Sequence, residues 1–159
     1  MQVCVRELRR EEIPLLREFL YLSIFVPEGQ PPLPREILDT PEFQVYVRNF
    51  GKEPHDCALV AEAEGQVVGA ACARIMEDYG HLDEHTPSLA IALLPSCRGQ
   101  GWGEQLLQSL LELLQARGES GVSLSVQREN RRAVNLYRKL GFAVAVDKGE
   151  EYVMRKELR

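Results

Sequence analysis

The sequence predicts one domain of the α/β or α+β class, in which helices cover a mixed sheet. Its length of 159 residues is that of one ordinary domain. Its composition, 45% apolar and 27% charged, is typical of a globular protein with a buried core. Hairpin-like strand pairs flank a central strand–helix–strand–helix segment, an order that implies a mixed sheet with helices packed on it. Since no internal repeat or interdomain linker is evident, residues 1–159 are expected to form a single domain.

The first fifty residues predict one strand and two helices. Residues 2–8 alternate between apolar and polar types and predict a strand. Apolar residues at helical spacing predict a helix over 9–25. Four prolines within 26–34 predict a stiff, extended loop, because proline fixes φ and restricts the residue before it. A second helix is expected over 35–50, with a break or a new start at Pro41.

The middle of the chain predicts a hairpin and a buried strand. Two apolar runs, 56–63 and 66–76, flank a short Glu64-Gly65 turn and predict a β-hairpin. A polar loop is expected over 77–87. The continuous apolar run 88–94 is typical of a strand buried on both faces.

The last third predicts two further helices and three strands. The leucine-rich segment 104–117 predicts a helix that Gly118 ends. The expected elements that follow are a strand over 121–126, a helix over 130–140, and a closing strand pair over 142–146 and 151–158.

Charge and cysteine content exclude several classes of protein. The formal net charge is −5 with acids and bases interspersed, which argues against a general nucleic-acid partner. The four cysteines form no C-x-x-C pair and are expected to be small hydrophobes in a reducing cytosol; with only three histidines, no metal site is expected. There is no apolar signal core and no apolar run near the roughly 18 residues that span a bilayer. We therefore expect a cytoplasmic protein with no membrane partner.

A glycine-rich loop links the buried strand to the leucine-rich helix. Gly99, Gly101 and Gly103 follow Arg98 at alternate positions. Glycine lets main-chain amides turn toward an anion, and the free N–H groups at the start of a helix add to this site. Arginine adds a permanent charge suited to a phosphate. The loop therefore predicts binding of a phosphate or pyrophosphate, against the alternative that it is only a tight turn.

Two common phosphate loops do not fit this segment. G-x-x-x-x-G-K-[ST] is absent because no Lys-Ser or Lys-Thr follows the glycines, which excludes a P-loop NTPase. G-x-G-x-x-G fails because the glycines are spaced by two throughout, and the next strand ends in Val126-Gln127 rather than an acid.

Two motifs resemble the GNAT superfamily of acyl-CoA-dependent N-acyltransferases. Arg98, Gly101 and Gly103 match its pyrophosphate loop, R-x-x-G-x-G, and residues 130–142 match its N-x-x-A-x-x-L-Y-x-x-x-G-F helix. The resemblance covers roughly residue 60 to the C-terminus closely. It implies a central, mostly antiparallel sheet with a splayed parallel strand pair, flanked by helices, and acetyl-CoA as cosubstrate without a metal.

The resemblance also implies where coenzyme A binds. The pantetheine arm is expected beside Ile91, Ala92 and Leu93, and the pyrophosphate beside Arg98 and the main-chain amides of Gly99, Gln100, Gly101, Trp102, Gly103 and Glu104. Trp102 is also expected to have a packing role. Asn130, Ala133 and Tyr137 recur every three to four residues on the helix and are expected to face the same ligand.

Tyr137 is the expected general acid. An amine that attacks a thioester releases a thiolate, whose conjugate thiol has a pKa of about 8.5. A phenol within hydrogen-bond reach can protonate that sulfur. The competing interpretation is a tyrosine that packs its ring in the core.

The general base is less well marked in the sequence. In ribosomal-protein acetyltransferases of this superfamily the base is a Glu on the strand before the Asn motif, where this chain has Ser125. Related bacterial sequences carry a Glu at the start of the buried strand, where this chain has Ser88. The remaining candidates are acids of the 77–87 loop, of which Glu84 is the tentative base; the others are Glu77, Asp78 and Asp83.

The expected function is transfer of an acetyl group to a primary amine of a small molecule or peptide. The acceptor site is expected to be built from the first two helices and the 26–34 loop. Because dimers are common in the superfamily, a homodimer is also an expectation. The alternatives are an acyl-CoA-binding sensor or interaction module that has lost catalysis, and a nucleotide-binding domain.

Overall fold

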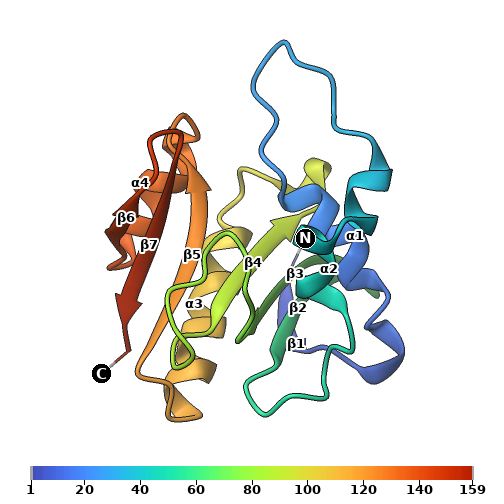
Figure 1. Ribbon diagram of the computed structural model, residues 1–159. Helices are drawn as coiled ribbons and strands as arrows, with labels where there is room; N and C mark the ends of the chain where they lie inside the picture. The colour runs from blue at the N-terminus through green and yellow to red at the C-terminus, as the bar shows by residue number, and fades with distance from the viewer. Residues whose placement is uncertain (1, 159) are drawn as a thin grey trace.

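The computed structural model describes residues 2–158, over which seven strands form one sheet with helices on both faces (Figure 1). The strands are β1 (Cys4–Glu7), β2 (Cys57–Ala63), β3 (Gln66–Arg74), β4 (Ser88–Leu93), β5 (Gly121–Gln127), β6 (Ala143–Asp147) and β7 (Glu151–Glu157). The helices are α1 (Leu15–Ser23), α2 (Pro41–Val47), α3 (Trp102–Ala116) and α4 (Arg131–Lys139). Short 3₁₀ turns cover Arg10–Glu12, Arg35–Asp39 and Pro95–Cys97.

The sheet parts in its middle. Its order is β1-β2-β3-β4-β5-β7-β6, and within residues 2–158 the one parallel pair is β4 with β5. The register of this pair joins only Ser88 to Ser123, and the Ser123 N–H donates to the Pro87 carbonyl at 2.9 Å. Beyond these residues the strands diverge, as Figure 1 shows. The predicted mostly antiparallel sheet with a splayed parallel pair is confirmed.

The hairpin between β2 and β3 turns at Glu64 and Gly65. Both residues have positive φ, 52° and 78°. A two-residue turn of this kind matches the right-handed twist of the flanking strands, and glycine adopts it without steric cost. The hairpin predicted from the two apolar runs is therefore confirmed, with antiparallel pairing from Cys57↔Ala73 to Ala63↔Gln66.

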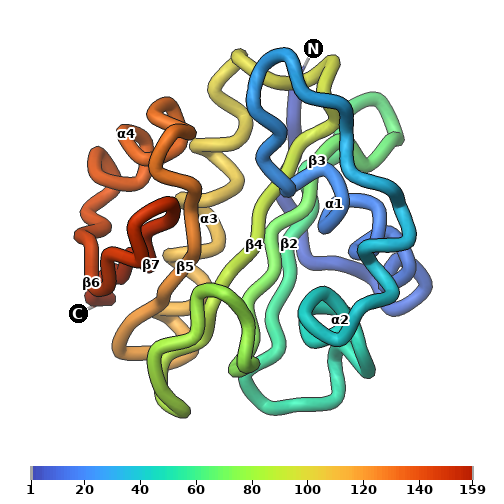
Figure 2. Tube along the Cα trace, turned by 45° about the horizontal axis from the view of Figure 1, so that its top comes forward, coloured from blue at the N-terminus to red at the C-terminus, as the bar shows by residue number. Residues whose placement is uncertain are grey.

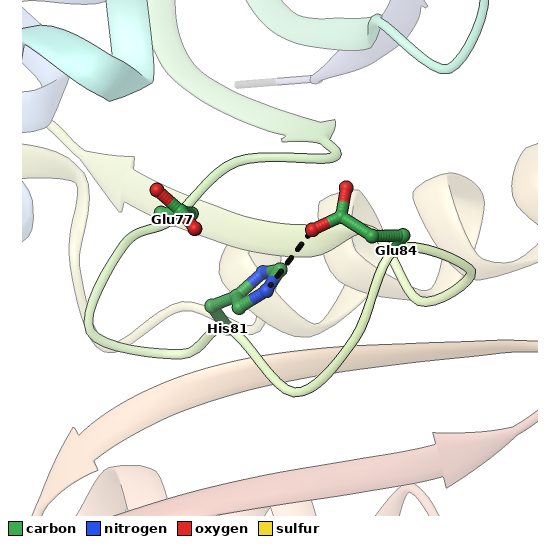
Figure 3. Close-up of side chains that lie close together, drawn as sticks. All are labelled: Glu77, His81 and Glu84. Carbon is green, nitrogen blue, oxygen red and sulfur yellow. Dashed lines mark ion pairs between the residues drawn. The ribbon is translucent and has the colours of Figure 1, made fainter.

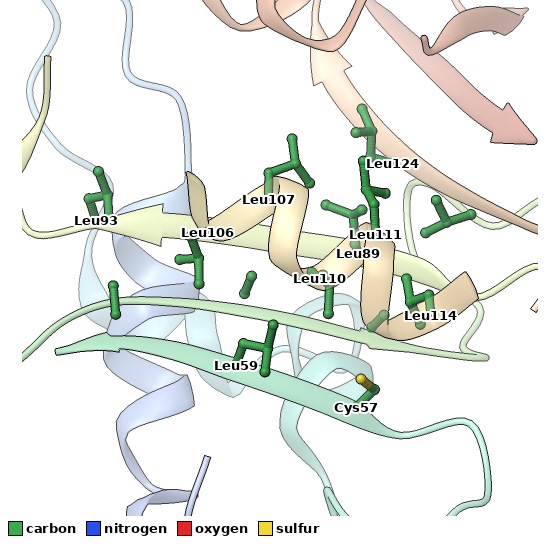
Figure 4. Close-up of a cluster of buried hydrophobic side chains, with 14 of the residues drawn as sticks. Cys57, Leu59, Leu89, Leu93, Leu106, Leu107, Leu110, Leu111, Leu114 and Leu124 are labelled. Carbon is green, nitrogen blue, oxygen red and sulfur yellow. The ribbon is translucent and has the colours of Figure 1, made fainter. Parts of the chain in front are cut away.

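Helix α3 covers one face of the sheet with a row of buried leucines. Figure 4 shows these leucines on α3, with Leu59 of β2, Leu89 of β4 and Leu124 of β5 around them. Each is at most 4% exposed: Leu106, Leu107, Leu110, Leu111 and Leu114. They pack on alternate strand residues, among them Leu59 and Leu89, because successive strand side chains point to opposite faces.

Helices α1 and α2 cover the other face. Val60, Ala70 and Cys72 pack with Leu16 and Phe19 of α1. A neighbouring cluster joins α1 to α2 and holds Leu20, Leu38, Tyr46 and Met76. The small residues of β3 and β4 let these helices lie close to the sheet.

The N-terminal helical segments are shorter than the sequence predicts. The segment 9–25 begins with a 3₁₀ turn, and the α-helix covers only Leu15–Ser23, after Pro14. The segment 35–50 is broken at Thr40, which is extended, and α2 begins at Pro41. Proline favours the first position of a helix because its missing N–H would have no partner there.

A buried ion pair fixes the end of α2 against the sheet. The Arg74 guanidinium of β3 donates to both carboxylate oxygens of Asp56 at 3.0 Å. Arg74 Nη1 also donates to the carbonyls of Val45 (3.2 Å) and Arg48 (2.8 Å). The two charged side chains are almost completely buried, 6% and 1% exposed.

Within residues 2–158, each helix is too short or too polar to traverse a lipid bilayer.

Candidate active site

Two cavities meet where β4 and β5 part. The larger has a volume of about 760 Å³ and extends from the glycine loop along β4. The smaller, of about 390 Å³, lies between α1, α2, β4 and β5. The residues that line both are Ile24, Phe25, Leu33, Ile91 and Tyr137. Figure 2 shows the gap between β4 and β5, with the loop after α1 passing beside it. We call the two the coenzyme cavity and the acceptor cavity, after the roles argued below.

The glycine loop forms one end of the coenzyme cavity. Gly99 and Gly101 have φ of 80° and 84°, a conformation that a residue with a Cβ atom rarely adopts. Helix α3 starts directly after Gly101 and has no side-chain cap among the described residues. Its first N–H groups are therefore free of an intramolecular side-chain partner, and they lie at the positive end of the helix dipole.

Two arginines supply positive charge at this end. Arg98 lines the cavity, and its guanidinium donates to the Leu22 carbonyl at the end of α1, at 3.1 Å. Arg132 of α4 also lines the cavity, and its Nη2 lies 3.5 Å from the position that a Cβ on Gly99 would occupy. Arg132 was not among the site residues predicted from the sequence. The signal available was its place two residues after Asn130, in a variable position of the helix motif.

Helix α4 places Tyr137 at the junction of the two cavities. Asn130 caps this helix, since its side-chain oxygen accepts the Ala133 N–H at 3.4 Å. The Tyr137 ring packs 5.8 Å from the ring of Phe142. Burial raises the pKa of Tyr137 to about 12, so the phenol is neutral at physiological pH. None of the described residues hydrogen-bonds its hydroxyl, which leaves that group available to a ligand.

The acceptor cavity has an aromatic wall. Phe43 lies between Tyr46, at a ring separation of 6.3 Å, and Tyr79, at 5.8 Å. The polar residues that line the cavity are Ser23, Ser125, Gln127 and Glu151 with the tyrosine hydroxyls. Among the described residues that line it there is no Lys, Arg or His. This wall therefore suits a cation on an apolar body better than an anion.

A half-buried carboxylate, Asp78, lies beside this wall. Ser88 Oγ, at the start of β4, donates to Asp78 Oδ1 at 2.7 Å. The Tyr46 hydroxyl faces the same carboxylate. Burial raises the pKa of Asp78 above its usual range, because the loss of hydration outweighs these hydrogen bonds. Burial likewise raises the pKa of Tyr46.

Most of the residues expected to contact coenzyme A line the coenzyme cavity. They are Ile91, Ala92, Leu93, Arg98, Gly99, Gly101, Gly103, Glu104, Asn130, Ala133 and Tyr137. Gln100 is exposed on the loop. Trp102, the first residue of α3, is partly buried and packs against the core, which agrees with a packing role.

Glu84, the tentative base, lies away from both cavities. Its side chain is 73% exposed and pairs with His81, whose Nε2 lies 3.5 Å from Glu84 Oε1 (Figure 3). Glu77 completes a group whose ligand-type atoms lie within 4.8 Å of one another. Neither glutamate lines a cavity, and both are exposed.

Ser125 and Ser88 occupy the two positions at which relatives are expected to carry a catalytic glutamate. Ser125 lines the acceptor cavity directly. Ser88 is 1% exposed and contacts Asp78, so the start of β4 does carry a carboxylate, contributed by the preceding loop. Asp78 was among the candidates predicted from the sequence, but Glu84 was preferred, because nothing in the local sequence shows which acid packs against the strands.

Comparison with known proteins gives one consistent result. The sequence profile of the acetyltransferase (GNAT) family matches residues 20–142. An N-alpha-acetyltransferase of Sulfurisphaera tokodaii is 35% identical over 99 residues, which are 57% of this chain and 59% of that protein. The chain therefore spans less than two thirds of that relative. A putative [ribosomal protein bS18]-alanine N-acetyltransferase of Bacillus subtilis is 29% identical over 140 residues, 88% of this chain and 80% of that protein.

Solved structures of N-acetyltransferases share the fold. The PaiA N-acetyltransferase of Thermoplasma acidophilum, solved in complex with coenzyme A, superimposes with a TM-score of 0.72 at 19% identity and covers 99% of each chain. At this identity the likeness concerns the fold alone.

Proposed function

The chain belongs to the acetyltransferase (GNAT) family, and from that premise we propose that it transfers an acetyl group from acetyl-CoA to a primary amine of a small molecule or peptide. The observation that carries the proposal is the position of Tyr137, which lines both the coenzyme cavity and the acceptor cavity. A donor bound in one cavity and an amine bound in the other would meet at this side chain.

Each end of the coenzyme cavity is lined by groups that suit one part of coenzyme A. The free N–H groups at the start of α3, with Arg98 and Arg132, suit a pyrophosphate. Ile91, Ala92 and Leu93 of the diverging strand β4 line the apolar stretch where the pantetheine arm would lie. Acetyl-CoA supplies the acetyl group as a thioester.

Tyr137 acts as the general acid in this proposal. The amine forms a bond to the acetyl carbon as the bond from that carbon to sulfur breaks. Tyr137 then gives its proton to the leaving thiolate and recovers one from the nitrogen of the new amide. Its raised pKa, about 12, keeps the phenol protonated until the thiolate forms.

A second candidate function is an acyl-CoA sensor without catalysis. Ser88 and Ser125 stand where relatives are expected to carry a catalytic glutamate, and this favours a weak or inactive enzyme. The sensor would bind coenzyme A but release no thiol when amines are added.

Two measurements test the proposal. Coenzyme A is expected to raise the melting temperature of the protein, and thiol release from acetyl-CoA is expected in the presence of polyamines, amino acids, aminoglycosides or N-terminal peptides. Arg98→Ala and Arg132→Ala should each weaken coenzyme A binding by about ten- to hundredfold, as loss of a charged hydrogen bond costs about 1.5–3 kcal/mol. An exposed arginine outside both cavities, Arg17, provides the matched control substitution Arg17→Ala.

The outcomes separate the candidates. A shift with coenzyme A and no thiol release with any amine would favour the sensor. A shift with NAD or ATP but not with coenzyme A would contradict both.

A further inference from the structure

The loop between β3 and β4 is held at the base of the split sheet by contacts with both parted strands. Ser88 Oγ of β4 donates to Asp78, and Ser123 Oγ of β5 donates to the Gly80 carbonyl at 2.7 Å. Gly80 lies so close to β5 that a Cβ atom on it would fall 2.9 Å from the main chain of Leu124 and Ser125. Asp78 is thereby fixed beneath the acceptor cavity.

Tyr46 separates the Asp78 carboxylate from the cavity. Tyr46 lines the acceptor cavity and is only 6% exposed, so the rest of its side chain packs against other residues of the core. Its hydroxyl faces the Asp78 carboxylate and the Tyr79 amide. A hydroxyl that is both donor and acceptor can pass a proton onward, because it takes one as it gives its own.

The groups around Asp78 suit a carboxylate that can take up a proton, rather than one that an ion pair keeps ionised. The groups that face the Asp78–Tyr46 pair are the Ser88 hydroxyl from β4, the Cys72 thiol from β3, and the Tyr79 and Gly80 amides of the loop itself. Arg74 of β3 is committed to Asp56 and the carbonyls at the end of α2, and Lys148 donates to the Tyr79 carbonyl at 3.2 Å. Because none of the described cations pairs with Asp78, burial raises the pKa of this carboxyl above that of an exposed aspartate, toward neutral pH.

We propose that Asp78, acting through the Tyr46 hydroxyl, removes the proton from the incoming ammonium group of the acceptor. This inference rests on the proposed acetyl transfer. The ammonium N–H bond breaks and its proton moves to the Tyr46 oxygen, while the Tyr46 proton moves to Asp78. The neutral amine then attacks the thioester, and Asp78 later releases the proton to solvent. The net change is one proton released per acetyl group transferred.

The test compares two amines that differ in basicity. An alkylamine is an ammonium ion at neutral pH, because its pKa is about 10. Its fluorinated analogue is similar in shape but is unprotonated at the same pH. For the alkylamine, Asp78→Asn should lower kcat at neutral pH by about 10²- to 10⁴-fold, the range of general acid–base catalysis. The deficit should shrink as pH approaches the amine pKa, and it should nearly vanish for the fluorinated amine.

Two further variants sharpen the comparison. Tyr46→Phe keeps the ring and removes the relay, so it should reproduce the Asp78→Asn pattern. Asp147→Asn is the matched control, since Asp147 of β6 is exposed, pairs with Arg128 and lines neither cavity. Its pH profile should equal that of the unsubstituted protein. A retained coenzyme A melting shift shows that each variant is folded.

Each outcome has a distinct meaning. An equal deficit for both amines, or a pH profile of Asp78→Asn parallel to that of the unsubstituted protein, overturns the role of Asp78. If Glu84→Gln removes the fall of kcat at acidic pH and Asp78→Asn does not, the base is Glu84 instead. If the unsubstituted protein transfers to neither amine, nor to any other amine of the panel, the proposed function itself fails.

Discussion

Tyr137 shows how a single side chain is placed by the residues on either side of it. The Asn130 cap begins α4 seven residues earlier, and Phe142 packs on the Tyr137 ring just after the helix ends. These contacts bury the ring between the two cavities, and burial raises the pKa of the phenol to about 12. The same packing that positions the hydroxyl therefore also keeps it protonated.

The role of Tyr137 can be measured by removing one oxygen atom. Tyr137→Phe should lower kcat by about 10²- to 10⁴-fold and change the affinity for coenzyme A only a few-fold, because the ring and its contacts remain. A raised pKa means that the acid form persists through neutral pH and is lost only as pH rises through about 12. The kcat profile below pH of about 10 should accordingly show no basic limb from this group.

The control is Tyr152→Phe, a tyrosine of β7 that lines neither cavity. An unchanged kcat in Tyr137→Phe would remove Tyr137 from the mechanism. A large loss of coenzyme A affinity with normal kcat would make it a binding residue.

Residues in local patterns could be predicted from the sequence, whereas residues that depend on tertiary contacts could not. Arg98, the loop glycines, Asn130 and Tyr137 stand at fixed spacings within one loop or one helix, and all line the coenzyme cavity. Arg132 reaches the same cavity from a variable helix position. Asp78 differs from Glu84 only in burial and in its partner Ser88, ten residues away.

At the scale of elements, the Asp56–Arg74 pair connects α2 with the hairpin β2–β3. Arg74 binds the carbonyls at the C-terminal end of α2, while Asp56 accepts the Gly51 and Glu53 N–H groups of the connecting loop. Since α2 carries Tyr46 and Phe43, this pair also supports the wall of the acceptor cavity.

Asp56→Ala is expected to lower the free energy of unfolding by about 3–5 kcal/mol, because it leaves the Arg74 charge buried without a partner. Asp39→Ala removes a carboxylate from a pair that is 45% and 64% exposed, and it should cost at most about 1 kcal/mol. Urea denaturation of both variants measures the difference. Equal, small losses would show that water reaches Arg74.

The elements that were predicted best are those with strong local signals. The type of turn at Glu64-Gly65, the leucine row of α3 and the glycine after α4 each fix one boundary. The helical segments before and after the 26–34 loop were predicted too long, since amphipathic spacing continues through 3₁₀ turns and prolines that interrupt the hydrogen bonding.

At the scale of the whole molecule, the gap between β4 and β5 divides one sheet into two parts. The four strands β1 to β4 lie on one side, and β5, β7 and β6 lie on the other. Helix α3 connects the two parts, and its leucines pack with Leu89 of β4 and Leu124 of β5. The chain order predicted the mixed sheet, but not that the last strand in sequence would lie between β5 and β6.

A ligand in the coenzyme cavity contacts both sides of this gap, so it should stabilise the two parts together. Hydrogen exchange of the amides in β4 and in the first turn of α3 is expected to slow when coenzyme A is added. Amides of the edge strand β6, whose residues are all exposed, should exchange at unchanged rates.

Mass spectrometry of the exchanged protein measures these effects. Equal protection of every segment would indicate a global stabilisation without local contact. No protection in β4 would contradict the placement of the ligand along that strand.

The segment from Val26 to Pro34 borders both cavities through Leu33 and remains outside the sheet. Pro31, Pro32 and Pro34 have no amide hydrogen to place, and Leu33 is fastened only at its carbonyl, by the Tyr21 hydroxyl at 2.6 Å. Substitutions in this segment should therefore reshape the walls of both cavities without disturbing the strand pairing of the sheet.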